Sequence, residues 1–303
     1  MARAWADLLC AMLACNLASA AFLMVPISVA ARQSGDPQKK LKNRSLHWSP
    51  PAVDSPIHTL ASAPPCVLAN VLGQAALSVN ELITNLQNFT AQEKIEYQTT
   101  DRDAIVLDLG SATFDYVVDF EKSPGGLVLQ EIRNPRRGSS LSAAATQDTG
   151  VPEIVLIFLP NMQADYEMSC DGAVERNHQL AWVIHFRQRK GKPSRTYSFR
   201  VNNIVYPVGL KGRAWVASDS GQVVHMETSL MEEVPAIGVH EAYLSIDYAP
   251  VQFQKRPVRI WLPQSVDGFC DFGNHRTIVS HTFSDFMLFS VQTDQKIEKP
   301  KQP

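Results

Sequence analysis

Apolar and polar residues alternate one by one along most of this chain, which is the pattern of strands with one buried face. One such strand is predicted at 89–98, with Phe89 and Tyr97 on its apolar side. The clearest spans 114–121, where every second residue is apolar: Phe114, Tyr116, Val118 and Phe120. Ser123-Pro-Gly-Gly126 predicts a turn, and Leu127 to Glu131 completes a hairpin.

The same alternation returns in the second half of the chain. The predicted strands lie at 166–170, 181–189, 195–201, 212–217, 222–231, 239–248, 258–262, 268–271, 277–283 and 286–293. Short turn sequences separate most of them, without the helical crossovers that parallel strands need. The pattern therefore predicts an antiparallel meander.

Two segments break this pattern and favour helices. From Cys66 to Leu86, apolar residues recur every three or four positions, which indicates one amphipathic helix. The apolar run 151–159 has Pro152 near its start and Pro160 at its end, which favours a short buried helix over a strand. We therefore predict a mainly β protein with few helices (α+β).

A large meander with two helices leaves one apolar sheet face to cover. Either the sheet curls around its helices, or two sheets stack. In a curled sheet, any apolar surface that the helices leave uncovered is a site for an apolar ligand. The candidate lining residues, which would equally suit an ordinary core, are Phe89, Tyr97, Phe114, Tyr116, Val118, Phe120, Trp182, Ile184 and Phe186.

The two ends of the chain differ from the middle. Residues 1–31 combine Arg3, an apolar run and small residues at its end, which is typical of a cleaved secretory signal peptide; a retained membrane anchor is the alternative. Residues 32–66 are rich in Pro and Ser and indicate a disordered linker, and 294–303 a frayed tail. One domain is thus expected at 67–293.

Cleavage of the signal peptide would leave three cysteines, an odd number: Cys66, Cys170 and Cys270. In an oxidising compartment Cys170 and Cys270 could pair, and separate buried thiols are the alternative.

Composition narrows the possible functions. The chain has 28 basic and 30 acidic residues, so no long-range field draws it to nucleic acid. We expect no nucleic-acid partner. The basic run of Arg187, Arg189, Lys190 and Lys192 is interpreted as a solvated hairpin tip, with a docking patch for an acidic partner as the alternative.

The sequence contains no recognisable catalytic or cofactor motif, so we expect neither enzyme nor cofactor. His281, Ser284 and Asp285 are close in sequence, but Ser284-Asp285 is interpreted as a bend rather than part of a triad. A metal cluster would need folding to gather four histidines, which we interpret instead as surface or capping residues: His225, His240, His275 and His281.

Two stretches resemble a known family. The strand Gly212-Arg-Ala-Trp-Val-Ala217, followed after a turn by Gly221-Gln-Val-Val-His-Met-Glu227, resembles the periplasmic outer-membrane lipoprotein-sorting and carrier proteins. Tyr248-Ala-Pro-Val251 through Trp261-Leu-Pro-Gln-Ser-Val266 resembles their later strands. The resemblance covers about 67–292, and the loop 133–150 and the arm 33–65 depart from it.

That resemblance implies a half-open β-barrel with helices lidding its concave face. The cargo it implies is the acyl chains of lipid or lipoprotein, held without catalysis in the periplasm or as a secreted or membrane-tethered protein. An envelope protein is the possible partner. The alternative function is an envelope structural or interaction module with a closed core and no ligand. No functional residue of the family matches a particular position here.

Overall fold

The computed structural model describes residues 31–32, 48–85, 88–123, 126–136, 148–149, 154–202, 204–253 and 259–288, all within one body of residues 27–290. Most of the predicted signal peptide, residues 33–47 of the predicted linker, most of the loop 133–150 and the tail 294–303 lie outside these ranges. Within them, no helix is both long enough and apolar enough to cross a membrane.

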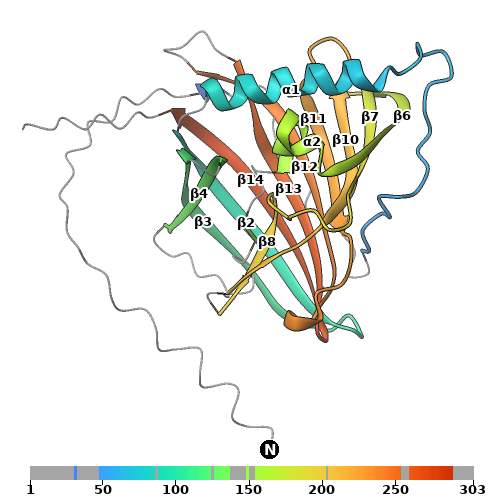
Figure 1. The fold of residues 1–303 in the computed structure, drawn as a ribbon. Coiled ribbons are helices and arrows are strands. Elements are labelled where there is room, and N and C mark those ends of the chain that lie inside the picture. The colour runs from blue at the N-terminus through green and yellow to red at the C-terminus, as the bar shows by residue number, and fades with distance from the viewer. Residues whose placement is uncertain are drawn as a thin grey trace, which may run out of the picture. The chain divides into compact units, whose positions relative to one another are not determined.

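Eleven strands of the described chain form one antiparallel sheet, in the order β4-β3-β2-β14-β13-β12-β11-β10-β7-β6, with β1 paired to β12 (Figure 1). Its strands are β1 (Ala31–Arg32), β2 (Asn88–Asp101), β3 (Val106–Ser123), β4 (Gly126–Pro135), β6 (Tyr166–Arg176), β7 (Gln179–Gln188), β10 (Leu210–Ala217), β11 (Val223–Leu230), β12 (Val239–Phe253), β13 (Arg259–Phe272) and β14 (His275–Leu288). A small second sheet contains β5 (Asp148–Thr149), β8 (Ser198–Val201) and β9 (Ile204–Pro207). The predicted meander is confirmed, because the neighbours in the large sheet pair antiparallel.

Some predicted strand boundaries are wrong. The described part of the segment 258–262, residues 259–262, and the segment 268–271 are parts of one strand, β13, which continues through Pro263 opposite a bulge at Asp247/Tyr248. The segment 277–283 and the described part of the segment 286–293, residues 286–288, likewise join in β14, where a bulge between Ser284 and Met287 gives Asp285 a φ of 52°. A bulge inserts a residue without ending the ladder, so a bend in the pattern does not mark a strand end.

Both predicted helices are present. Helix α1 (Leu68–Asn85) buries Val71, Ala75 and Val79, spaced four residues apart on one face. The run 154–158 forms a 3₁₀ helix, η3 (Ile154–Phe158), followed by α2 (Pro160–Gln163). All five residues of η3 are buried, so it acts as a plug rather than an amphipathic surface helix.

The large sheet is curved and open, because its edge strands β4 and β6 do not pair with each other in the described chain. We call the face that carries Phe89, Tyr116 and Ile184 the concave face, and the opposite one the convex face. Helix α1 crosses one end of the sheet (Figure 1). The concave face forms the main core together with residues of α1, η3 and the β8 region, including Tyr197 and Phe199. The molecule is thus a mainly β, half-open barrel with helices on its concave side.

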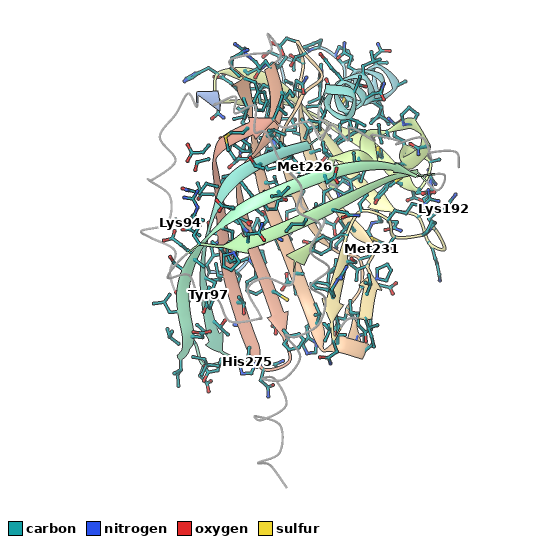
Figure 2. All side chains as sticks on the ribbon, turned by 90° about the vertical axis from the view of Figure 1, so that its left-hand side faces the viewer. Lys94, Tyr97, Lys192, Met226, Met231 and His275 are labelled. Carbon is teal, nitrogen blue, oxygen red and sulfur yellow. A yellow bond between two sulfur atoms is a disulfide. The ribbon has the colours of Figure 1, made fainter. Side chains whose placement is uncertain are left out.

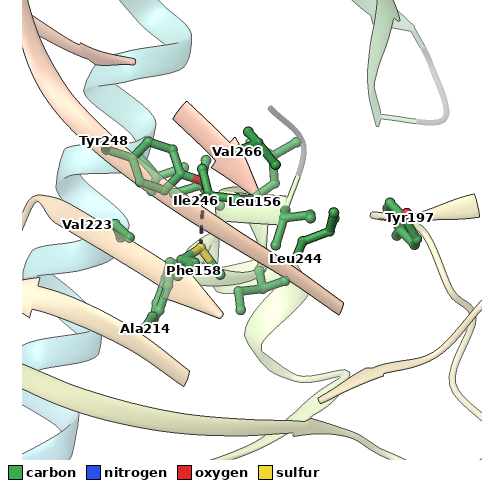
Figure 3. Packing of buried hydrophobic residues seen from close by; sticks show 14 of the residues in the cluster. Leu156, Phe158, Tyr197, Ala214, Val223, Leu244, Ile246, Tyr248 and Val266 are labelled. Atoms are coloured by element: carbon green, nitrogen blue, oxygen red, sulfur yellow. Dashed lines mark hydrogen bonds between the residues drawn. The ribbon is translucent and has the colours of Figure 1, made fainter. Parts of the chain in front are cut away.

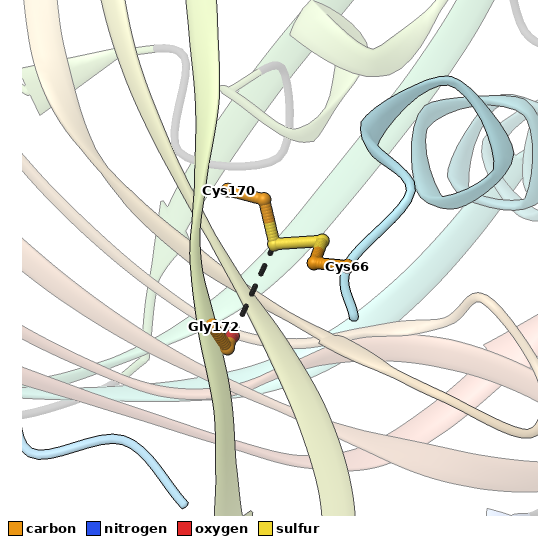
Figure 4. Close-up of a disulfide and its surroundings, with 3 residues drawn as sticks. All are labelled: Cys66, Cys170 and Gly172. Carbon is orange, nitrogen blue, oxygen red and sulfur yellow. Dashed lines mark hydrogen bonds between the residues drawn. A yellow bond between two sulfur atoms is a disulfide. The ribbon is translucent and has the colours of Figure 1, made fainter. Parts of the chain in front are cut away.

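Residues 48–66, which we call the strap, contain no helix or strand but contact the sheet at several points. The strap ends in a disulfide between Cys66 and Cys170 of edge strand β6 (Figure 4). The pairing of Cys170 with Cys270 considered from the sequence is therefore wrong. Cys270 lies on β13 and keeps its thiol outside this bond. Sequence spacing could not reveal the true partner, since the bonded residues are 104 positions apart.

Candidate functional site

The candidate lining residues meet on the concave face. In the β2–β3 ladder Phe89 pairs with Val118, and directly opposed residues of an antiparallel pair share a face. Phe114 and Tyr116 follow on the same side of β3 by alternation, and Tyr97 on the same side of β2. On β7, Ile184 and Phe186 reach the same core, and Trp182 packs against it. Phe120 lies on β3, and its side chain is outside the described set.

These residues fall into two apolar clusters. Phe89, Tyr116, Val118, Ile184 and Phe186 belong to the main core. Tyr97 and Phe114 belong to a second cluster, whose members are Ile95, Tyr97, Ala112, Phe114 and Val279. In Figure 2, Tyr97 lies above His275, near the end of the sheet where β14 begins. All seven are buried by the protein itself, so whether they also contact a ligand stays a prediction.

All five residues of the plug η3 belong to the main cluster. Figure 3 shows Phe158 and Leu156 among concave-face residues of the sheet, including Ala214 and Ile246. The hydroxyl of Tyr248 donates a hydrogen bond of 3.8 Å to the sulfur of Met226. The side chains of this short element thus cover part of the concave face.

A group of charged residues lies between the two apolar clusters. We call Glu93, Glu131, Arg133 and His281, together with Tyr116 of the adjoining main core, the Glu93 cluster; they come from β2, β3, β4 and β14. Glu93 lies between Ala91 of the main core and Ile95 of the second cluster along β2. Its side chain has no exposed surface, and those of Glu131 and His281 are 3% exposed.

The geometry of the cluster centres on the Glu93 carboxylate. Arg133 Nε donates to Glu93 Oε2 at 2.7 Å, and His281 Nδ1 lies 2.7 Å from Glu93 Oε1. Arg133 Nη2 is also 3.3 Å from Glu131 Oε2, and the guanidinium lies 5.1 Å above the Tyr116 ring. One cation therefore serves two buried carboxylates, and His281 contributes a second donor.

The pKa values follow from this arrangement. Burial alone would raise the pKa of Glu93, but the hydrogen bond and charge of His281, together with Arg133, outweigh it and lower that pKa. Burial, followed by the charge of Glu131, raises the pKa of the Tyr116 hydroxyl well above its ordinary value. Glu93 is therefore ionised and Tyr116 neutral at pH 7. The cluster is a polar group within the otherwise apolar concave face.

Glu93, Glu131 and Arg133 were not predicted from the sequence as site residues. A signal for Glu93 was present, because it occupies an apolar phase of the alternation between Phe89 and Tyr97. For Arg133 and Glu131 the signal was weaker, since both lie at the end of the predicted hairpin where the pattern becomes polar.

The histidines do not form the arrangements considered from the sequence. His281 is directed to Glu93, whereas Asp285 is exposed at the β14 bulge, as the predicted bend suggests. Among the residues that the structure describes, no group of three or more His, Cys, Asp or Glu side chains is placed to hold a metal. The surface or capping interpretation is wrong for His225 and His281, which are buried and paired with Asp247 and Glu93.

The basic run at the end of β7 is exposed to solvent, and three of its four residues also pair with acidic residues. Arg187 contacts Asp54 of the strap, Arg189 contacts Glu167, and Lys192 contacts Asp165. Elsewhere, a small open cleft of about 10 Å³ lies between Leu82 of α1 and Trp261 of β13.

Comparison with known proteins found similar solved structures, and the three described here have TM-scores below 0.5. No protein-family model and no curated protein matches the chain. Among solved structures, it is similar to a DUF1329 family protein from Desulfovibrio piger, with 8% identity, a TM-score of 0.41, and 76% of this chain and 97% of the other covered. A putative outer membrane lipoprotein-sorting protein domain from Vibrio parahaemolyticus matches with 11% identity, a TM-score of 0.38, and 73% and 95% covered. A LolA superfamily protein from Nitrosomonas europaea matches with 12% identity, a TM-score of 0.30, and 75% and 96% covered.

Two of these three structures carry lipoprotein-sorting or LolA names, the group that the sequence resembles.

Proposed function

We propose that this protein is an exported, non-enzymatic carrier that holds the acyl chains of lipid or lipoprotein against its concave face. The observation that carries this proposal is the nature of the cover on that face. Apart from α1, which crosses one end of the sheet, this apolar surface is covered by short pieces, chiefly η3 of five residues and β8 of four.

Short elements of this kind have few backbone hydrogen bonds of their own, so they open at lower free energy than the long ladders of the sheet. The side chains that η3 places on the sheet, Ile154 to Phe158, have the same apolar character as an acyl chain. Cargo would therefore exchange one apolar contact for another when it displaces the plug, with little net cost in buried apolar area.

The disulfide between Cys66 and Cys170 supports an oxidising compartment such as the periplasm. Export agrees with the signal peptide predicted at 1–31, and a membrane-tethered form remains the alternative if that segment is retained. An envelope protein would then deliver or receive the cargo.

Two valines on opposite faces of the sheet offer a matched test. Val118 faces the concave core and Val183 faces the convex side, and both have 0% exposure. Either change to Ala should lower the free energy of unfolding by about 2 kcal/mol. Only Val118→Ala should weaken the binding of a fluorescent fatty acid, by about tenfold, because it removes apolar contact from the proposed site.

The cargo itself is identified from protein purified from its native membranes, by mass spectrometry of the extracted lipid. Equal fatty-acid affinity in the two valine variants, or no saturable binding to the unaltered protein, would contradict the proposal.

The alternative function is an envelope interaction module with a closed core. The near-complete burial of Phe89, Tyr116 and Phe158 favours it, because these side chains already pack against one another or against the plug. Under this function the purified protein contains no lipid, and capture of one particular envelope protein persists after detergent delipidation.

A further inference from the structure

The convex face of the sheet holds the strap in a way that resembles the recognition of a separate peptide. Between its contact points the strap is exposed, and it has no helix or strand of its own. Its contacts come from a few side chains spaced along an extended segment, which is how grooves commonly bind short peptides.

The first contacts are apolar. The ring of Trp48 lies edge-on to Tyr243 and Phe269, with centroid distances of 6.1 and 5.9 Å. Val53, 2% exposed, packs into the same cluster. Ile57 enters a second cluster of the convex face, formed by Ala181, Val183 and Trp215.

Between these apolar contacts lies an acidic anchor. The Asp54 carboxylate is 3.0 Å from His185 Nε2 and 3.4 Å from Arg187 Nη2, and it also pairs with Lys211. Burial alone would raise the pKa of Asp54, but hydrogen bonds from Lys211 and His185 and the nearby charges lower it. Without Asp54, the positive charges of Arg187 and Lys211 would face one another with no carboxylate between them.

Backbone contacts fix the direction of the segment. Arg213 Nη1 donates to the Ser55 carbonyl at 3.0 Å, while Glu227 holds the same guanidinium from the other side at 2.6 Å. Farther along, Leu60 N donates to Ala173 O of edge strand β6 at 2.8 Å. A Cβ on Gly172 would lie 2.9 Å from Thr59 Cγ2, so this glycine permits the close approach of the strap to β6.

The residues that receive the strap belong to long ladders. They lie on β7, β10, β12 and β13, whose pairing does not involve the strap. The surface is therefore preformed, and a preformed site loses little conformational entropy when a segment binds to it.

We propose that the convex face is a recognition surface for extended peptides that carry an aromatic residue, a Val-Asp pair five residues later and an aliphatic residue three positions after the Asp. The strap is the copy of this pattern that occupies the surface within the same chain. A segment of a partner protein with the same pattern can take its place. This site is independent of the acyl-chain site, because it lies on the opposite face of the sheet.

The test uses a labelled peptide of residues 47–62 and the full-length chain with both main anchors removed, Trp48→Ala with Asp54→Ala. We expect saturable binding of the peptide to this double variant. Binding should be at least tenfold weaker for a peptide with Asp54→Asn, and at least tenfold weaker to the unaltered chain, whose own strap occupies the surface. Adding Arg187→Ala to the double variant should also weaken peptide binding. Adding Arg189→Ala instead should leave binding unchanged, because Arg189 contacts Glu167 and not the strap.

Hydrogen exchange of the unaltered chain gives a second measurement that needs no variant. The amide of Leu60 should exchange well before the amides of the β10–β11 ladder. Exchange of the strap only together with that ladder would overturn the proposal, and so would loss of folding in the double variant, since the strap would then be an integral part of the fold. Equal binding of the two peptides would also overturn it.

Discussion

His281 Nδ1 donates a hydrogen bond of 2.7 Å to Glu93 Oε1, and this contact joins β14 to β2 across 188 residues of sequence. Both side chains lie on the concave face, where their neighbours along each strand are apolar. Burial of a carboxylate costs several kcal/mol in desolvation, so it needs several good contacts to persist. Arg133 provides another, and residues of β14 and β4 thus both contact the Glu93 carboxylate on β2.

The first prediction concerns the loss of that group. Glu93→Gln leaves the Arg133 guanidinium buried beside Glu131 alone, and we expect the free energy of unfolding to fall by about 3 to 5 kcal/mol. Urea denaturation followed by circular dichroism measures this change. Asp115→Asn serves as the control, because Asp115 pairs with Arg136 at 2.8 Å on the exposed side and should change stability by less than about 1 kcal/mol. Similar effects of the two substitutions would show that the Glu93 cluster is not a buried charge network.

The second prediction concerns acid. The pKa of Glu93 in the folded protein is below its ordinary value of 4.5, so the unfolded chain binds more protons than the folded one in the acidic range. The stability that Glu93 contributes is present above pH 4.5 and is lost as the pH falls through its folded value. Glu227, whose pKa is also lowered, adds to the same trend. Between pH 7 and pH 3, the free energy of unfolding should fall more steeply for the unaltered protein than for Glu93→Gln. An equal pH dependence in the two proteins would contradict a lowered pKa of Glu93.

The third prediction concerns the disulfide. Cys66 and Cys170 are 104 residues apart, and a cross-link over a loop of that length restricts the unfolded chain by about 4 to 5 kcal/mol. Reduction or Cys66→Ser should lower the free energy of unfolding by about this amount. Cys270→Ser is the matched control and should retain the full response to reductant. A stability that does not respond to reductant would mean that the bond does not form in solution.

The fourth prediction tests the packing of β10 against β11. A Cβ on Gly212 would lie 2.0 Å from the backbone oxygen of Glu227, so Gly212→Ala forces these strands apart and should cost about 3 kcal/mol. Gly73 lies on the exposed side of α1 with no atom within 4 Å of its added Cβ, so Gly73→Ala should instead stabilise by about 1 kcal/mol. In thermal unfolding, Gly212→Ala should lower the melting temperature and Gly73→Ala should raise it. An unchanged melting temperature for Gly212→Ala would contradict the β10–β11 register.

The strands and helices were largely predictable because their signals are local. The alternation at 114–121 and the four-residue spacing of Val71, Ala75 and Val79 each reflect one buried face. The merging of segments into β13 and β14 was not predictable from these patterns, since a bulge at Ser284 produces the same break in alternation as a strand end.

The contacts that position the site depend on distant residues, and the chain pattern does not encode them. The strap has the composition of a linker, yet Trp48, Asp54 and Ile57 find partners more than a hundred residues away. The pairing of Glu93 with Arg133 and His281 likewise follows from strand order, which alternation alone leaves open. The residues on the concave face were predicted as a set because they share one phase of the alternation; their charged centre was not.

A photoreactive fatty acid tests the carrier proposal most directly. After irradiation with the purified full-length protein, mass spectrometry of the digested chain locates each adduct. We expect adducts on concave-face residues of β2, β3 and β7 and on η3, and we expect excess unlabelled fatty acid to abolish them. Adducts confined to the convex face or the turns, or adducts that excess fatty acid does not remove, would contradict an acyl-chain site on the concave face.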